Sequence, residues 1–184
     1  HSQCMIEGPS SPCKDGETIY MLNYNSGTGD TLMSSSWTLN PILGTIATAS
    51  KNKILISWNA EGSTLLQVRF ITSLGDTFTC EKTIMVHSTL EFEVYSSINR
   101  ICKQKDKEYF ATCITDLTLF YTDSVYGYNY KWYLDNSQLS SIIHRTELIQ
   151  FISTGLHILK LIAEDSINGC AYIKEFNVRV FDPP

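Results

Sequence analysis

Six cysteines are the residues of this 184-residue chain whose type and spacing most directly indicate chemistry. An even number favours disulfide bonds, which form in oxidising compartments. The sequence contains no Cys-x-x-Cys pair, and no histidine lies where it would complete a zinc-finger spacing. We therefore expect disulfides, no metal site and no cofactor.

Four histidines are the candidate general bases: His1, His87, His144 and His157. His157 alternates with apolar residues, which is typical of a surface or half-buried strand position. No Gly-x-Ser-x-Gly turn, His-Glu-x-x-His helix or phosphate-binding glycine loop occurs in the sequence. We predict that the chain is not an enzyme.

A run of tyrosines between residues 126 and 133 is the most suggestive binding feature. Aromatic rings stack on sugars or on apolar peptide side chains, and Tyr126 and Tyr128 could form a small platform where a loop meets a strand. We take Tyr126, Tyr128 and Tyr133 as candidate ligand-binding residues. The alternative is that the loop tyrosines only cover the end of a domain, while Tyr130 and Trp132 belong to the core.

The charge pattern narrows the classes of partner. The net charge is −5, and nucleic-acid binding needs a basic surface. The basic residues at 100, 103, 105 and 107 are interrupted by acidic ones, as on a solvated face. No apolar run approaches the roughly 20 residues that cross a bilayer. We expect no nucleic-acid partner and no membrane-spanning segment.

Strand patterns dominate the sequence. Short runs of β-branched and aromatic residues alternate with clusters of Gly, Asn, Asp and Ser about every ten residues. Helical patterns are scarce, and in 137–149 the serines and isoleucines favour a strand or turn. We predict strands at 18–22, 36–39, 44–49, 53–58, 65–72, 78–86, 117–121, 130–134, 147–151, 155–163 and 171–180. The strand at 155–163 has apolar residues on both faces, which predicts burial on much of both. The fold class is all-β.

The two halves of the chain resemble each other. Corresponding residues are a cysteine seven positions before an aromatic ring (Cys13 and Tyr20; Cys113 and Phe120), a central tryptophan (Trp37; Trp132), a cysteine before the last strand (Cys80; Cys170) and an early cysteine (Cys4; Cys102). A duplicated module explains these matches together. We predict domains at 1–87 and 100–184, joined by a short, partly apolar linker at 88–99 that packs against a domain.

These residues resemble a known family. Ile6-Glu7-Gly8-Pro9 with Cys13, Tyr20, Trp37, 54–58 and Gly62 is similar to the polycystic-kidney-disease-like (PKD-like) repeat of secreted Bacteroidetes proteins. In the second half, 130–132, 154–161, Asp165 and 168–170 resemble the same pattern. The Gly-Asp-Gly turn common in that family is replaced here by 133–137. The resemblance implies two tandem immunoglobulin-like (PKD-like) β-sandwich domains.

Together with the duplication, the resemblance implies that Cys13 pairs with Cys80 and Cys113 with Cys170. The sequence leaves open whether Cys4 and Cys102 pair with each other or with a neighbouring chain.

The expected function is a non-catalytic structural or adhesion repeat of an exported bacterial cell-surface protein, acting as a stalk or assembly module. Its partners would be other domains of the same polypeptide or of a surface assembly. Two alternatives remain: a module that binds carbohydrate or protein through the tyrosine loop, and accessory domains of a secreted hydrolase. The expected location is secreted or on the cell surface.

Overall fold

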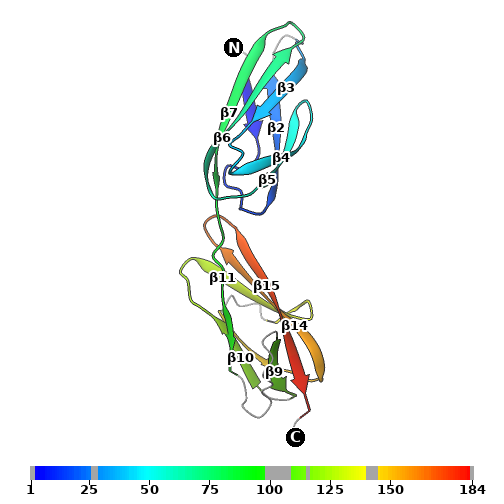
Figure 1. The fold of residues 1–184 in the computed structure, drawn as a ribbon, viewed down its shortest axis with the longest axis vertical. Helices are drawn as coiled ribbons and strands as arrows, with labels where there is room; N and C mark the ends of the chain where they lie inside the picture. Colours follow the sequence, from blue (N-terminus) through cyan, green and yellow to red (C-terminus); the bar gives the residue numbers. More distant parts are fainter. Residues whose placement is uncertain (1–2, 26–28, 98–108, 115–116, 140–144, 183–184) are drawn as a thin grey trace. The chain divides into compact units, whose positions relative to one another are not determined.

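The computed structural model describes residues 3–25, 29–97, 109–114, 117–139 and 145–182, and these form two β-sandwich units (Figure 1). Contacts between Cα atoms divide the chain into unit 1, His1–Thr89, and unit 2, Leu90–Pro184. Segment 88–99, our predicted linker, contains a short strand that pairs with a strand of unit 2. It also contains Phe92, whose side chain is buried in the core of unit 2.

In unit 1, the residues that the structure describes form seven strands in two sheets. They are β1 (Gln3–Glu7), β2 (Glu17–Asn25), β3 (Leu32–Thr38), β4 (Gly44–Ala49), β5 (Lys53–Trp58), β6 (Gly62–Thr72) and β7 (Thr77–Val86). One sheet has the order β1-β2-β5-β4 and the other the order β3-β6-β7. Within each sheet all the strand pairs are antiparallel. These two strand orders are those of a constant-type immunoglobulin domain.

Alternation along the strands places the core of unit 1 between its sheets. Ile54, Ile56 and Trp58 are buried on β5, and alternate residues of β6 from Leu66 to Phe70 are buried opposite them. Successive strand residues point to opposite faces, so these two rows meet as the inner faces of a sandwich. The indole Nε1 of Trp58 donates a hydrogen bond to Thr18 Oγ1 at 3.1 Å, which satisfies the polar atom of this buried ring.

The described residues of unit 2 form eight strands. They are β8 (Val94–Ser96), β9 (Tyr109–Cys113), β10 (Leu117–Thr122), β11 (Tyr128–Leu134), β12 (Ser137–Gln138), β13 (Thr146–Gln150), β14 (Gly155–Asp165) and β15 (Ala171–Phe181). The sheets have the orders β13-β10-β8 and β12-β11-β14-β15-β9. Only the β9–β15 ladder is parallel among the strand pairs that the structure describes.

The central strand β14 corrects one prediction. Leu159, Leu161 and Ala163 are fully buried, as expected of the inner face. The opposite face is only partly buried, because Ile158 is 43% exposed and Lys160 and Ile162 are half-buried. The apolar residues on both faces therefore do not indicate equal burial of both faces.

The predicted duplication is visible in the topology. Cys13 forms an isolated parallel bridge with His87, at the end of β7. Cys113 lies opposite Phe181, at the end of β15, in a parallel ladder. In both units the aromatic ring seven residues later, Tyr20 or Phe120, is fully buried. The two cysteines thus occupy equivalent places in two copies of one fold.

The prediction of two tandem immunoglobulin-like β-sandwiches is confirmed. Each predicted strand overlaps an observed strand. Four strands were missed: β1, β8, β9 and β12. β8 and β12 have three and two residues, too few for a visible alternation.

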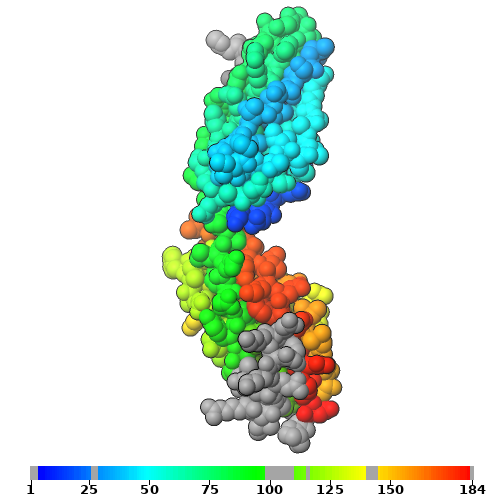
Figure 2. Space-filling view, viewed as in Figure 1, coloured from blue at the N-terminus to red at the C-terminus, as the bar shows by residue number. Residues whose placement is uncertain are grey.

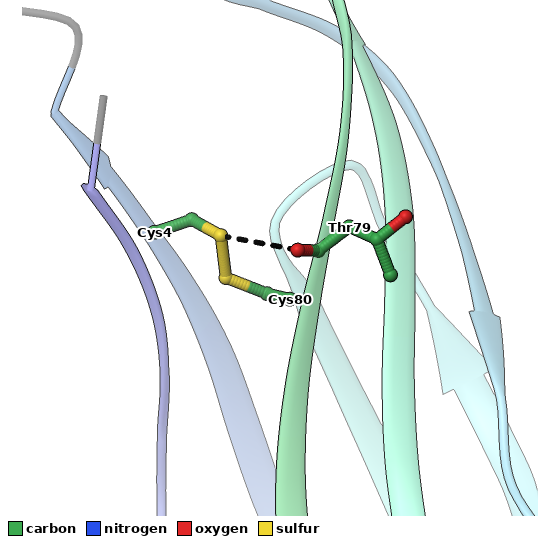
Figure 3. Close-up of a disulfide and its surroundings, with 3 residues drawn as sticks. All are labelled: Cys4, Thr79 and Cys80. Carbon is green, nitrogen blue, oxygen red and sulfur yellow. Dashed lines mark hydrogen bonds between the residues drawn. A yellow bond between two sulfur atoms is a disulfide. The ribbon is translucent and has the colours of Figure 1, made fainter. Parts of the chain in front are cut away.

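The predicted pairing of Cys13 with Cys80 is wrong, because Cys80 is bonded to Cys4 with a Cα–Cα distance of 6.0 Å (Figure 3). Cys13 lies opposite His87, seven residues farther along the extended strand, or about 23 Å away at strand rise. A disulfide cannot span more than about 7 Å between Cα atoms. The dashed contact of 3.7 Å from Cys4 Sγ to the Thr79 carbonyl oxygen is a packing contact, since a disulfide sulfur carries no proton.

The same geometry separates Cys113 from Cys170. Cys170 precedes β15, whereas Cys113 lies opposite its last residue, Phe181. Eleven extended residues span about 36 Å, so these two cysteines do not pair either. Cys13, Cys113 and Cys170 are nevertheless disulfide-bonded. Cys102 lies outside the described residues.

Candidate functional site

The tyrosine loop of unit 2 precedes β11 and is held in place by a core residue. Tyr130 is buried, and its hydroxyl accepts a hydrogen bond from the Val125 N–H at 3.1 Å and donates one to the Asp123 carbonyl at 3.2 Å. Gly127 has a φ of 86°, a left-handed conformation that closes the turn. Tyr126, at the tip, is completely exposed.

The other two candidate tyrosines do not join Tyr126 in one platform. The Tyr128 ring packs against Phe92 at 5.0 Å, and its hydroxyl accepts a hydrogen bond from the Leu90 N–H at 3.4 Å. Tyr133 lies on the opposite face of β11, where Lys160 Nζ is 5.1 Å from its ring. Odd and even positions of a strand face opposite sides, so Tyr128 and Tyr133 cannot bind one ligand together. Ligand binding by these residues stays a prediction.

A Ser–His–Asp arrangement, missed by the sequence analysis, lies at the β11–β12 turn. His157 Nδ1 is 2.7 Å from Asp135 Oδ2, and Ser153 Oγ is 3.5 Å from His157 Nε2. His157 Nε2 is closer, at 3.1 Å, to the Ser153 carbonyl oxygen. A carbonyl oxygen only accepts, so Nε2 must carry a proton in that bond and cannot take one from the serine.

The local structure explains why Asp135 is at this position. Asp135 and Asn136 have φ values of 48° and 68°, the left-handed pair of a two-residue hairpin turn that Asp and Asn tolerate. The Ile158 N–H donates to Asp135 Oδ1 at 2.9 Å. Burial acts to raise the pKa of Asp135, but this N–H and His157 outweigh it and lower the pKa. The cluster links the β11–β12 turn to β14.

Unit 1 holds a second acidic cluster, centred on Asp30. The Ser73 hydroxyl donates to Asp30 Oδ1 at 2.6 Å, and the Tyr24 hydroxyl donates to Oδ2 at 3.1 Å. The Leu74 N–H also donates to Oδ1, at 3.2 Å. Desolvation acts to raise the pKa of Asp30, but these donors outweigh it and lower the pKa to about 2. The carboxylate links the start of β3 to the β6–β7 turn.

The outer face of sheet β13-β10-β8 in unit 2 and that of sheet β1-β2-β5-β4 in unit 1 differ in charge. In unit 2, the strand residues on the outer face of β13-β10-β8 are apolar or uncharged. Leu117 and Leu148 are exposed there, and Tyr95 stacks on Tyr121 at 5.4 Å. The corresponding face of β1-β2-β5-β4 in unit 1 mixes three exposed apolar residues with three charged ones: Met5, Ile19 and Met21 with Glu7, Glu17 and Lys53.

Two further findings concern the described residues alone. They contain no group of three His, Cys, Asp or Glu side chains placed to hold a metal ion. They also contain no helix of the length and apolar character that a bilayer crossing requires.

Comparison with known proteins gives no family model and no curated protein that matches this chain. Among solved structures, a fragment of intimin in complex with the intimin-binding domain of its translocated receptor is 13% identical, with a TM-score of 0.52. It matches 100% of this chain, which spans 64% of that fragment.

Two other solved structures match both units at lower similarity. The fibronectin(III)-like modules of Clostridium thermocellum CbhA are 12% identical, with a TM-score of 0.46, over 97% of this chain and 95% of theirs. The tandem immunoglobulin repeats of Dlar are 10% identical, with a TM-score of 0.36, over 98% of each chain. At these identities the likeness to the intimin fragment shows the immunoglobulin-like fold.

Proposed function

We propose that this chain is a pair of non-catalytic structural or adhesion repeats of an exported bacterial surface protein, which acts as a stalk or assembly module. The repeats are of the PKD-like kind and of Bacteroidetes type, at 1–87 and 100–184 with 88–99 between them. Disulfides in both units favour an oxidising, extracellular location. The partners are other domains of the same polypeptide or surface assembly.

The position of the Cys4–Cys80 disulfide carries this proposal. Cys4 lies in the first strand of unit 1 and Cys80 in the last, so the bond encloses the residues between them. A force that pulls the chain ends apart passes from Cys4 through the sulfur atoms into β7 and bypasses residues 5–79. The sandwich can then transmit tension without being extended, which a stalk requires.

Single-molecule pulling on the non-reduced chain tests the stalk role. The enclosed 75 residues would add about 27 nm of contour length on extension, at 3.6 Å per residue. We expect no release of this length in the oxidised chain and a full release once all the disulfides are reduced, because Cys13 is also bonded to a cysteine beyond residue 80. A full release in the oxidised chain would contradict the proposal, because the load would then run through the sandwich.

The complete exposure of Tyr126 favours one second candidate, a module that binds a glycan or a protein. A screen of the non-reduced chain against glycan and matrix-protein arrays tests it, with Tyr126→Ala as the variant. Tyr128→Ala is unsuitable alone because Tyr128 packs on Phe92. Selective binding that is lost in Tyr126→Ala would replace the stalk role by recognition. The third possibility, accessory domains of a secreted hydrolase, predicts a catalytic domain in the full-length gene product.

A further inference from the structure

The open side of unit 1 carries a groove between the edge strands of its two sheets. Among the described strands, β3 pairs only with β6 and β4 only with β5. In Figure 2 the blue residues of β3 and the cyan residues of β4 adjoin on the visible face of unit 1. A hollow of about 480 Å³ lies along 33–37 of β3, and a second of about 330 Å³ continues it to Leu39 and Gly44. Trp37 and Ile46 line both hollows, so the groove follows the length of β3.

The floor of this groove contains a polar atom without a partner. Trp37 is only 8% exposed, and its indole Nε1 has no hydrogen-bond partner among the described residues. Buried donors in folded proteins nearly always have an acceptor. Nε1 is itself covered by protein atoms, so an acceptor in the groove would reach it only after the indole shifts.

The groove also has a defined charge and width. Lys51 is the one charged residue among those that line the two hollows. Ser35 Oγ donates a hydrogen bond to the Lys51 carbonyl at 2.5 Å, which fixes the distance between β3 and the β4–β5 turn at this end. The remaining walls are apolar side chains and small hydroxyls.

The edge of β3 is regular enough to pair with another strand. Its ladder shifts register between Leu32 and Ser34, and such irregularities protect edges locally. From Ser34 to Thr38 the register is continuous, which leaves five residues with strand geometry. Five residues are a usual strand length. The exposed N–H and C=O groups of an edge are a template for strand addition.

We propose that this groove binds an extended segment of a partner protein, which adds as a strand along β3, covers Trp37 and Ile46 with apolar side chains and places an acidic residue toward Lys51. A second copy of this chain fits less well. The β3 strand of a second copy, residues 34–38, carries no carboxylate to place toward Lys51. The inference goes beyond the stalk role, which needs no open edge.

A peptide library decides whether the groove binds a strand. Random nine-residue peptides displayed on phage are selected on the non-reduced chain, with the Ser35→Lys variant in solution as competitor. Ser35 faces the groove, so lysine there places a long cationic side chain in it. Enriched peptides should alternate apolar residues, lack proline and contain an acidic residue. Their synthetic forms should slow amide hydrogen exchange within 32–38.

Matched variants separate groove binding from other effects. Ser35→Lys should weaken binding of the synthetic peptides at least about tenfold, equivalent to 1.4 kcal/mol. Ser63→Lys, at an exposed position on β6 that lines neither hollow, should change it less than about twofold. If Ser35→Lys fails to fold, the exchange pattern in the unsubstituted chain still decides.

Three results would overturn the proposal. One is the absence of any peptide enriched over the competitor, and another is protection of a segment other than 32–38. The third is protection of 32–38 that rises with concentration in the chain alone, which would identify a second copy as the occupant.

Discussion

The two units share a core arrangement and differ at their edges. In both, a sheet built on the strand with the buried aromatic ring, β2 or β10, packs against a sheet that contains the central tryptophan. In unit 2, β12 pairs along part of β11 and β9 along β15. In unit 1, the described residues add no strand beside β3. The buried core positions are therefore common to both units, and the strands at the sheet edges are where the surfaces of the two units differ.

The central tryptophans show the consequence at the level of single atoms. Trp37 and Trp132 occupy equivalent strands and are both buried. Trp37 Nε1 has no hydrogen-bond partner, whereas Trp132 leaves no buried nitrogen unpaired among the described residues. The unit with the open edge is therefore also the unit with the unsatisfied donor.

The largest effect should come from the Cys4–Cys80 disulfide, which belongs to unit 1 alone. The Cys4→Ser/Cys80→Ser variant loses a cross-link over a sequence separation of 76, worth about 4 kcal/mol on the chain-entropy model. Chemical denaturation followed by hydrogen exchange should show this loss in β6 amides and little change in β14 amides. A loss below about 1 kcal/mol, or an equal loss in both units, would contradict the expected difference.

Two glycines with left-handed backbones give the next comparison. Gly8 in unit 1 has a φ of 134°, and an added Cβ would lie 2.5 Å from Tyr20 Cδ1. Gly155 in unit 2 has a φ of 121° with no atom within 4 Å of the same position. Gly155→Ala should cost about 1 kcal/mol from backbone strain alone. Gly8→Ala should cost about 2–3 kcal/mol because steric overlap with a buried ring is added.

Thermal unfolding of the two alanine variants measures this difference. Equal losses would show that the chain around Gly8 moves away from Tyr20 at little cost. Gly8→Ser serves as a further check, since its Cβ meets the same ring.

The tryptophans themselves provide a third test. Trp37→Phe loses packing contacts but also removes a buried N–H that has no acceptor, and this removal is favourable. Trp132→Phe loses packing contacts without removing an unsatisfied N–H. An unsatisfied buried donor costs about 1–3 kcal/mol, so Trp132→Phe should destabilise its unit by about 1–2 kcal/mol more than Trp37→Phe destabilises the other. Denaturant midpoints resolved by hydrogen exchange measure both. A larger loss for Trp37→Phe would show that its indole N–H does have an acceptor in solution.

The sequence predicted the all-β fold, the duplication and the inner faces, because these depend on alternation within a strand. Ile54, Ile56 and Trp58 are the clearest case. The disulfide partners could not be predicted in this way. Cys13 and Cys80 look equivalent to Cys113 and Cys170, yet pairing depends on which end of the last strand each cysteine approaches.

The candidate site was predicted only in part. Tyr126 is exposed, as a platform requires, but Tyr128 contacts a residue of the predicted linker, Phe92. The contact between Asp135 and His157 joins residues 22 positions apart and depends on the β11–β12 turn. The open groove beside β3 depends on which strands lie at sheet edges, and strand order is not encoded in any local pattern.

Acid should affect the two units through different carboxylates. The pKa of Asp30 is about 2 in the folded chain against 3.8 ordinarily, so its hydrogen bonds stabilise unit 1 above about pH 4 and this contribution is lost as pH falls toward 2. The difference in thermal midpoint between the unsubstituted chain and Asp30→Asn should shrink over that range. Asp135 of unit 2 also has a lowered pKa, so Asp135→Asn is the matched variant. This substitution should leave the β6–β7 turn unaffected. A difference that stays constant with pH would show that Asp30 does not titrate with folding.

The smallest expected effect concerns the uncharged outer face of β13-β10-β8. Leu148 is 56% exposed there, so Leu148→Lys should change the free energy of unfolding by less than about 0.5 kcal/mol. It should nevertheless raise solubility, because one charge interrupts an apolar patch that has none. Met21→Lys, on the already charged face of unit 1, is the control and should raise solubility less. Light scattering as a function of concentration measures both. A large loss of stability in Leu148→Lys would mean that this face is covered in the folded protein, and the contrast between the two outer faces would then disappear.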